Sequence, residues 1–299
     1  MSKEQILIDY EIIKKLDEQG QFGETYLAKD INLNKIIVVK EIPFFNIRSV
    51  DQFKEAKILH KANHKHVARV NFAGYRDKVY KWDDEKRENV KKYDGQVVKH
   101  VCLSMDYYEN GSLEKMLSNK TIRGEDVLKI INHIIQGLHN IHSEGLVHHD
   151  IKPDNILFNN RWDAMISDFG VSEYLEKDRV VRGAILPILL HPPETIQLYR
   201  QTQKIVTNQQ TDIYQVGVLF YLMLRNITYY TFASEFNFLS SEDIQKKIIN
   251  GTLFKFEKLN NINKDLVKIL KTLLHKDPSK RYSRIIEASN KIAKFKNLY

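Results

Sequence analysis

The chain is predicted to be an α+β protein in which a strand-rich part precedes a helix-rich part. Residues 10–105 carry β-branched runs and turn signals, whereas most of the chain after residue 109 shows apolar residues at helical spacing. A hydrophobic content of 42% supports a packed core, and 28% charged residues suit a solvated surface. Strands followed by helices, rather than alternating with them, are typical of α+β segregation.

Five strands are expected in the first part. Residues 10–42 contain three of them, and the third is the β-branched run at residues 36–39, which ends at Lys40. Residues 67–75 and 97–105 supply two more.

One helix and one long connection complete the first part. A helix is expected at residues 50–62, where Phe53, Ala56 and Leu59 share one side. Residues 76–96 are dense in charge, so a long, solvated hairpin connection is expected there.

The second part is predicted to be mainly helical. Residues 127–141 repeat apolar side chains at helical spacing, and Gly145 follows as a stop signal. A helix with so broad an apolar face should be deeply buried. Further helices are expected at residues 211–224, 262–274 and 285–295.

Charge and cysteine content limit the functional classes. The net charge is +8, but 46 basic residues are interleaved with 38 acids, which favours a basic solvated surface over nucleic-acid binding. The single cysteine, Cys102, fits a reducing compartment. The N-terminus is polar, without a signal peptide, and no apolar run reaches the roughly 20 residues of a membrane span. A cytoplasmic location is expected, and the oligomeric state stays open.

The most informative stretch is residues 148–155 with Asp168-Phe169-Gly170. It places Asp150, Lys152, Asn155 and Asp168 within 19 residues. One carboxylate can orient an attacking hydroxyl and accept its proton, while an amide oxygen and a second carboxylate suit Mg²⁺. This set fits phosphoryl transfer from a nucleotide.

The two motifs, in this order and at this spacing, closely resemble the catalytic loop and the metal loop of eukaryotic-type protein kinases. The resemblance covers residues 10–298 and implies a bilobal fold. A small five-stranded antiparallel N-lobe with one helix would occupy residues 10–105, and a hinge residues 106–111. A larger, mainly helical C-lobe would occupy residues 112–298, and residues 1–9 would be a short extension.

The resemblance assigns roles to the polar residues. Asp150 would be the catalytic base, and Lys152 would neutralise charge on the transferred phosphate. Asn155 and Asp168 would hold Mg²⁺. A lysine at position 152 is typical of the Ser/Thr-directed branch of the family.

The resemblance also implies an ATP site. Lys40 would contact the α and β phosphates and pair with Glu55. The other implied cofactor-binding residues are Gly20, Phe22 and Gly23 of the glycine loop, Thr25 and Val38 above the adenine, the gatekeeper Met105, Asp106 and Tyr108 of the hinge, Ser112 near the ribose and Leu157 beneath the adenine.

Two further matches concern architecture rather than chemistry. Glu194 and Arg281 match a buried ion pair of the family, and Asp212 with Gly217 matches its central helix. Kinases of small molecules generally lack these elements.

Several positions depart from the family pattern. Glu18 stands where the first glycine of the loop is usual, and His149 stands where regulated kinases carry an arginine that receives an activating phosphate. Residues 175–191 contain no Ser, Thr or Tyr. Control by activation-loop phosphorylation is therefore predicted to be absent.

The expected substrate-binding platform also differs. Residues 183–190 are apolar, and Pro187 is nearest to the family threonine that braces the catalytic Asp and Lys. This stretch fits either a preference for a hydrophobic residue beside the acceptor or a docking patch for a protein. The nearby Lys177, Arg179 and Arg182 suit an acidic or already phosphorylated protein substrate, or simply a solvated basic edge.

The resulting prediction is a Ser/Thr protein kinase that uses ATP and Mg²⁺. The alternative is a pseudokinase that binds ATP or acts as a scaffold, since the glycine loop and the platform are irregular. A phosphotransferase for a small metabolite is a third reading, against which Lys152-Pro153 and the Glu194 and Arg281 match both argue.

Overall fold

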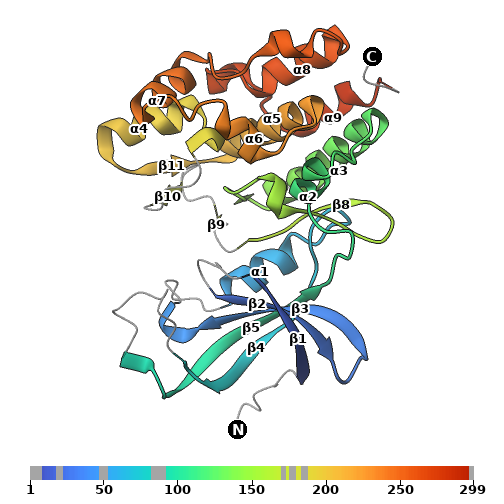
Figure 1. The fold of residues 1–299 in the computed structure, drawn as a ribbon, viewed down its shortest axis with the longest axis vertical. Helices are drawn as coiled ribbons and strands as arrows, with labels where there is room; N and C mark the ends of the chain where they lie inside the picture. Colours follow the sequence, from blue (N-terminus) through green and yellow to red (C-terminus); the bar gives the residue numbers. More distant parts are fainter. Residues whose placement is uncertain are drawn as a thin grey trace. The chain divides into compact units, whose positions relative to one another are not determined.

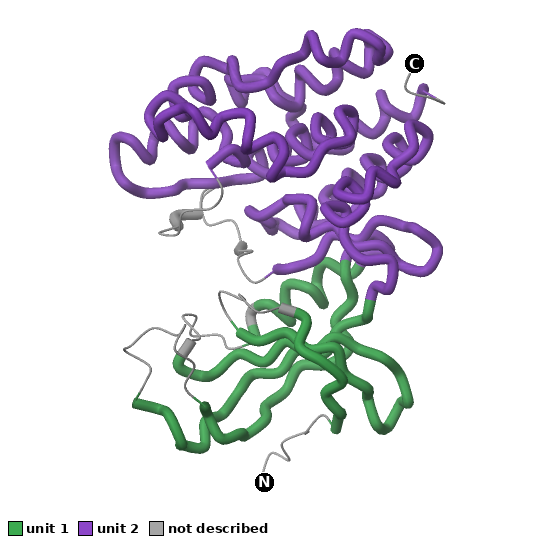
Figure 2. Tube along the Cα trace, in the orientation of Figure 1, with its two compact units in different colours: residues 1–63, 68–107 green, residues 64–67, 108–299 purple. Residues whose placement is uncertain are grey.

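The chain divides into two compact units, which are described separately (Figure 2). Unit 1 comprises residues 1–63 and 68–107, and unit 2 comprises residues 64–67 and 108–299. The computed structural model describes residues 9–17, 23–46, 53–81, 92–169, 173–174, 180–182 and 188–295.

Unit 1 is built on one five-stranded sheet (Figure 1). Its strands are β1 (Tyr10–Asp17), β2 (Glu24–Asp30), β3 (Lys35–Pro43), β4 (Val70–Val79) and β5 (Val97–Asp106). They follow the order β1-β2-β3-β5-β4, and every neighbouring pair is antiparallel. A short 3₁₀ turn, η1 (Phe44–Asn46), follows β3, and the helix α1 (Lys54–Lys61) packs against β4. The predicted five-stranded antiparallel sheet with one helix is confirmed.

One boundary in unit 1 differs from the prediction. Helix α1 runs over Lys54–Lys61, and residues 50–52 of the predicted helix lie outside the described residues. Strand β4 continues to Val79, which pairs with Val97, so residues 76–79 belong to the sheet and not to the connection. Val79 and Val97 are both exposed, which explains why no burial signal marked this end of the hairpin. Residues 82–91 lie outside the described residues.

The side chains of strand β3 alternate between a buried face of the sheet and the opposite face. Ile37, Val39 and Glu41 are buried on one face of the sheet. The Glu41 carboxylate accepts hydrogen bonds there from the Tyr10 hydroxyl and the Lys78 ammonium group. Because successive side chains of a strand point to opposite faces, Lys40 belongs to the other face.

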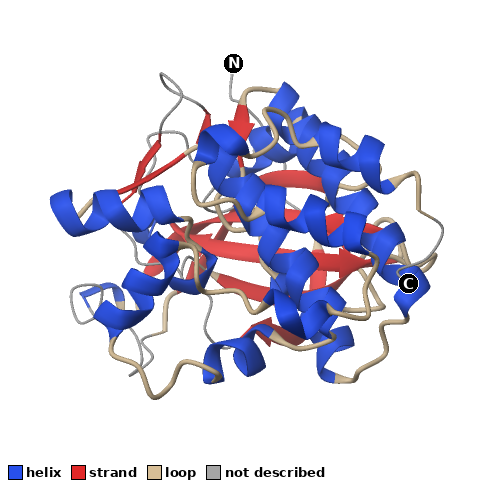
Figure 3. Ribbon diagram, turned by 90° about the horizontal axis from the view of Figure 1, so that it is seen from above, coloured by secondary structure: helices blue, strands red, loops and turns tan. Residues whose placement is uncertain are grey.

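Unit 2 is mainly helical, as predicted (Figure 3). Its helices are α2 (Leu113–Ser118), α3 (Gly124–Ser143), α4 (Pro193–Thr202), α5 (Gln209–Arg225), α6 (Tyr229–Ser234), α7 (Ser241–Asn250), α8 (Lys264–Leu273) and α9 (Ile286–Ile292). Its short strands are β6 (Leu146–Val147), β7 (Ile156–Phe158), β8 (Ala164–Ile166), β9 (Glu173–Tyr174), β10 (Val180–Arg182) and β11 (Ile205–Thr207). The 3₁₀ turns are η3 (Pro153–Asn155), η4 (Ile188–Leu190), η5 (Phe256–Leu259) and η6 (Pro278–Lys280).

Helices α3 and α5 form the core of unit 2. Helix α5 is buried from Thr211 to Met223, and it packs against α3 and α8. Gly217 allows the close approach to α8, because a Cβ atom there would lie 2.9 Å from Leu274 side-chain atoms. Gly145 follows α3 with a φ of +69°, the left-handed conformation that ends many helices. Among the described residues, no helix is long and apolar enough to cross a membrane.

Candidate active site

Lys40 and Glu55 form the predicted ion pair in unit 1. The Lys40 ammonium group donates to both carboxylate oxygens of Glu55 at 3.0 Å. The two side chains are only 12% and 10% exposed, so solvent screens the pair weakly. Strand β3 and the first turn of α1 therefore bring together two residues that are 15 positions apart, and this prediction is confirmed.

The residues predicted to lie above the adenine share the sheet face of Lys40. Thr25 is paired with Lys40 across β2 and β3, and Val38 is paired with Met105 across β3 and β5. Directly opposed residues of an antiparallel pair point to the same face, and Val38 and Lys40 are two positions apart. The strand register thus gathers Thr25, Val38, Lys40 and Met105 on one surface.

Gly23 is the described end of the predicted glycine loop. A Cβ atom at this position would lie 2.4 Å from the Glu41 carbonyl oxygen, so only glycine fits without a shift of the backbone. Gly20, Phe22 and Glu18 lie outside the described residues.

The predicted hinge residues have defined partners within their own units. The Asp106 carboxylate accepts from the Lys35 ammonium group at 2.6 Å and from the Asn71 side chain at 2.9 Å. Its backbone N–H donates to the Arg69 carbonyl. In unit 2 the Tyr108 carbonyl accepts from the Gly111 N–H.

Ser112 and Leu157 lie side by side in unit 2. They form an isolated β-bridge, which places the predicted ribose contact next to the predicted floor of the adenine site. The Ser112 hydroxyl accepts from the Lys115 N–H at 3.3 Å and so caps α2. A capping role accounts for this serine without a nucleotide.

Asp150, Lys152 and Asn155 are in direct contact. The Asp150 Oδ2 atom accepts from the Lys152 ammonium group at 2.8 Å and from the Asn155 side-chain amide at 3.0 Å. Asp150 is only 4% exposed, and its Oδ1 atom is buried with no hydrogen-bond partner among the described residues. One oxygen is therefore fixed, while the other is left for an incoming donor such as a hydroxyl.

Lys152 is kept charged by its surroundings. Burial acts to lower the pKa of Lys152, but the charges of Asp150 and Asp168 outweigh burial and raise this pKa. A permanent cation is thus held beside the candidate base.

The hairpin of β7 and β8 joins the two predicted metal ligands. Its strands pair from Ile156 with Ile166 to Phe158 with Ala164. At its open end Ser167 donates its backbone N–H to the Asn155 carbonyl at 2.8 Å, so Asp168 follows directly beside Asn155. The Asn155 Nδ2 atom is used by Asp150, which leaves its side-chain oxygen for a metal. An amide oxygen and a carboxylate are donors that Mg²⁺ prefers, so the residues present fit this ion.

Asp212 of α5 holds the backbone that precedes Asp150. Its two carboxylate oxygens accept the N–H groups of His148 and His149, both at 2.8 Å. The His142 Nε2 atom of α3 lies 2.8 Å from Asp212 Oδ2. Burial acts to raise the pKa of Asp212, but the hydrogen bond and charge of His142 outweigh it and lower this pKa.

His149 stands in place of the usual arginine, is buried, and contacts strand β11. Its Nδ1 atom lies 2.7 Å from the Thr207 hydroxyl at the end of β11. Strand β11 in turn pairs with β10 of the segment that follows Asp168. Sequence reasoning missed Thr207, because a histidine offers no sign of which distant hydroxyl it binds.

Glu194 and Arg281 form the predicted ion pair, although the Glu194 side chain is 31% exposed and so is not fully buried. Two parallel hydrogen bonds of 2.7 Å join the guanidinium group to the carboxylate, and the Arg281 side chain is fully buried. The same guanidinium group donates to the carbonyls of Gln210 and His275. This prediction is confirmed.

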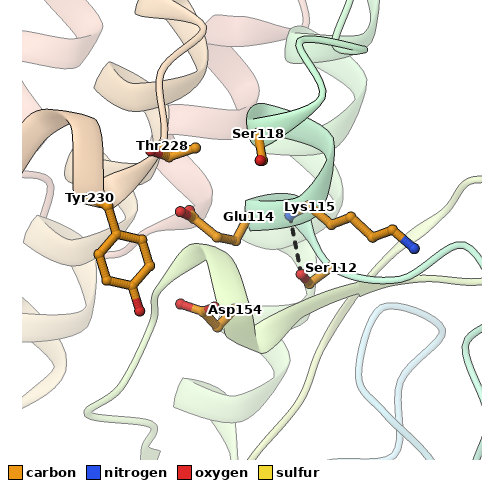
Figure 4. Close-up of a pocket in the computed structure, with 7 residues that line it drawn as sticks. All are labelled: Ser112, Glu114, Lys115, Ser118, Asp154, Thr228 and Tyr230. Carbon is orange, nitrogen blue, oxygen red and sulfur yellow. Dashed lines mark hydrogen bonds between the residues drawn. The ribbon is translucent and has the colours of Figure 1, made fainter.

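A pocket of about 490 Å³ lies beside α2 in unit 2 (Figure 4). Burial and the charge of Asp154 raise the pKa of Glu114, and burial raises that of Asp154. Two neighbouring carboxylates favour a cationic group between them. The pocket is lined by Ser112, Glu114, Lys115, Ser118, Asp154, Thr228 and Tyr230.

Comparison with known proteins agrees with this geometry. The family described as "Protein kinase domain" matches residues 10–293. A probable serine/threonine-protein kinase of Dictyostelium discoideum is 28% identical over 286 residues, which are 91% of this chain and 36% of that protein.

Two other relatives are more distant. Serine/threonine-protein kinase pkn2 of Myxococcus xanthus is 24% identical over 92% of this chain and 31% of its own length. Serine/threonine-protein kinase cds1 of Schizosaccharomyces pombe is 24% identical over 92% of this chain and 56% of its own length. The chain thus spans between about a third and just over half of these relatives.

Proposed function

Because the chain belongs to the protein kinase domain family, we propose that it transfers the γ-phosphoryl group of ATP to Ser or Thr hydroxyls of a protein. The observation that carries this proposal is the contact between Asp150, Lys152 and Asn155, in which one buried carboxylate oxygen has no partner among the described residues. The position of Lys152 and the names of the relatives support Ser/Thr specificity.

In this reaction the acceptor hydroxyl donates to Asp150 Oδ1. A bond forms between the hydroxyl oxygen and the γ-phosphorus, the bond from that phosphorus to ADP breaks, and the proton passes to the carboxylate. Lys152 offsets negative charge on the moving group. Asn155 and Asp168 would hold Mg²⁺, which would supply further positive charge to the phosphates.

In unit 1 we assign Lys40 to the α and β phosphates, with Glu55 fixing its direction. Thr25, Val38 and Met105 are assigned to the adenine. In unit 2 we assign Leu157 to the adenine and its bridge partner Ser112 to the ribose, as the family resemblance implies. Gly20, Phe22, Gly23, Asp106 and Tyr108 keep the cofactor-binding roles that the family resemblance implies.

Regulation by activation-loop phosphorylation is proposed to be absent. His149 is fully buried against Thr207, so it cannot offer a cationic fork to a phosphate. Residues 175–191 also lack any hydroxyl side chain. Phosphorylation of Ser172 or Tyr174 that proved necessary for activity would contradict this part of the proposal.

The protein substrate is proposed to be acidic or already phosphorylated, because Lys177, Arg179 and Arg182 directly precede the predicted platform in the sequence. The carboxylates of Glu114 and Asp154 instead favour a cation at another peptide position. A positional peptide array, in which Asp, phosphoserine or Arg is placed at each position, separates the two preferences.

A cytoplasmic setting is proposed from the single buried thiol, Cys102.

The test compares the wild type with Asp150→Ala, using ATP, Mg²⁺ and either dephosphorylated casein or histone as acceptor. We expect transfer to fall by about 10²- to 10⁴-fold in the variant. Asp265→Ala, which removes a carboxylate that is 65% exposed on α8, should leave the rate unchanged. A wild type that binds ATP but transfers no phosphate to either acceptor or to itself would favour the pseudokinase alternative.

A further inference from the structure

The backbone around Asp150 is held from both sides by one side chain of α5. The Gln215 Oε1 atom accepts from the Ile151 N–H at 3.1 Å, and its Nε2 atom donates to the His149 carbonyl at 3.0 Å. These two backbone groups belong to the residues immediately before and after Asp150. The amide of Gln215 therefore bridges the candidate base.

Gln215 and Asp212 together bind the backbone around Asp150. The two residues are three positions apart in α5, a spacing that places side chains on the same face of a helix. Asp212 binds the N–H groups of His148 and His149, while Gln215 binds the carbonyl of His149 and the N–H of Ile151. Gln215 is fully buried, so no water competes for these bonds.

A backbone of this shape needs such support. His149 has a φ of +72°, a left-handed conformation that is unfavourable for a residue with a Cβ atom. In the sequence, the threonine by which the resembling family braces the catalytic Asp and Lys has no clear counterpart, and Pro187 is nearest to its position. Proline has neither a hydroxyl group nor an N–H to offer.

We propose that Gln215 is a positioning residue, which fixes the peptide groups on both sides of Asp150 and so the direction of its carboxylate. This inference rests on the proposed phosphoryl transfer. Only a carboxamide of this length can serve, since a carboxylate lacks the donor and an asparagine is one methylene shorter. Because a small displacement of a reacting group lowers the rate steeply, the rate is the sensitive readout.

The test is Gln215→Met, which keeps the length of the side chain and removes both hydrogen bonds. Gln210→Met is the matched control, because Gln210 lies on the same helix and donates to the Tyr282 carbonyl at 3.0 Å, remote in sequence from Asp150. For each variant, kcat and the KM for ATP are measured with the acceptor that the wild type phosphorylates, together with the melting temperature.

We expect Gln215→Met to lower kcat by about 10- to 100-fold while the KM for ATP changes by less than about twofold. The control should keep the wild-type kcat. If Gln215→Met does not fold, Gln215→Glu carries the test, because it retains the acceptor for Ile151 and replaces the donor to His149 by a carboxylate oxygen that repels that carbonyl. For that variant a loss of about 10-fold in kcat is expected.

The inference is overturned if the folded variants keep the wild-type kcat. It is also overturned if kcat falls equally in Gln210→Met, since the effect would then follow stability alone. In both cases an active wild type leaves the proposed function intact. A wild type without transfer activity defeats the proposed function, and the role of Gln215 with it.

Discussion

Lys40 of unit 1 and Asp150 of unit 2 are fixed by different means. Lys40 is oriented by a two-point ion pair with Glu55, on a helix whose first turn begins at Lys54. Asp150 is oriented by Lys152 and Asn155, and the backbone on either side of it is bound by two side chains of the buried helix α5. The candidate base is thus built into a core, whereas the candidate phosphate contact is oriented by an ion pair between a strand and a short helix.

The strongest test of this difference is Asp212→Asn in unit 2. The new amide can accept only one of the two N–H groups, and its NH₂ group would face the other. We expect a loss of about 3–5 kcal/mol in the free energy of unfolding, measured by urea titration with circular dichroism. Asp265→Asn on the surface should change this free energy little, and equal losses in both variants would contradict the comparison.

Acid should lower the stability of unit 2 by protonating a pair of buried histidines. His66 and His133 stack at 3.9 Å between ring centroids, and burial lowers the pKa of each to about 4. Their ordinary pKa is 6.5, so the unfolded chain takes up protons that the folded chain refuses between pH 6.5 and pH 4. Stability is therefore complete above pH 6.5 and falls as the pH drops. At pH 5 the expected loss is about 2 kcal/mol for each ring.

Urea titrations at pH 7 and pH 5 measure this loss. His133→Gln should reduce the difference between the two pH values, while His60→Gln, at an exposed position of α1, should not. A wild-type stability that is the same at both pH values would show that these rings are not the acid-sensitive element.

Gly137 tests how closely α3 packs on the segment that carries His66. A Cβ atom at Gly137 would lie 2.5 Å from the His66 carbonyl, which accepts the Ile166 N–H. We expect Gly137→Ala to cost about 1–3 kcal/mol by thermal unfolding. Gly145→Ala is the comparison, since no atom lies within 4 Å there and only its φ of +69° opposes a side chain. Its cost should be about 1 kcal/mol, and a larger cost than that of Gly137→Ala would refute the packing argument.

The smallest change in stability is expected in unit 1. Glu55→Gln removes the charge that fixes Lys40 but keeps one acceptor, so the cost should be about 1–2 kcal/mol in a urea titration. Glu11→Gln, an exposed substitution on β1, serves as the control. A loss as large as that of Asp212→Asn would remove the contrast between the units.

The sequence predicted helices and strands best where one face of the element, or the whole element, is buried. Helices α3 and α5 lie within a few residues of the predicted ranges, because their apolar residues and Gly145 are local signals. The end of β4 was placed too soon, since its last pair, Val79 with Val97, is exposed and gives no burial signal.

The residues of the candidate site also fall into those that the sequence predicted and those that it did not. Pairs at a recognisable spacing, such as Lys40 with Glu55 and Glu194 with Arg281, could be predicted. Gln215 and Thr207 could not, because their partners are backbone and ring atoms about 60 residues away in the chain, which no local pattern encodes.

The only cysteine of the chain is buried at 1% exposure beside the Tyr10 hydroxyl, and burial raises the pKa of its thiol to about 11. Thiol reagents attack the thiolate, so Cys102 should stay unreacted in the folded protein at neutral pH. The native chain is thus already a suitable background for site-directed labelling. A cysteine introduced at any exposed position would take up a fluorophore or spin label alone, without prior removal of the natural one.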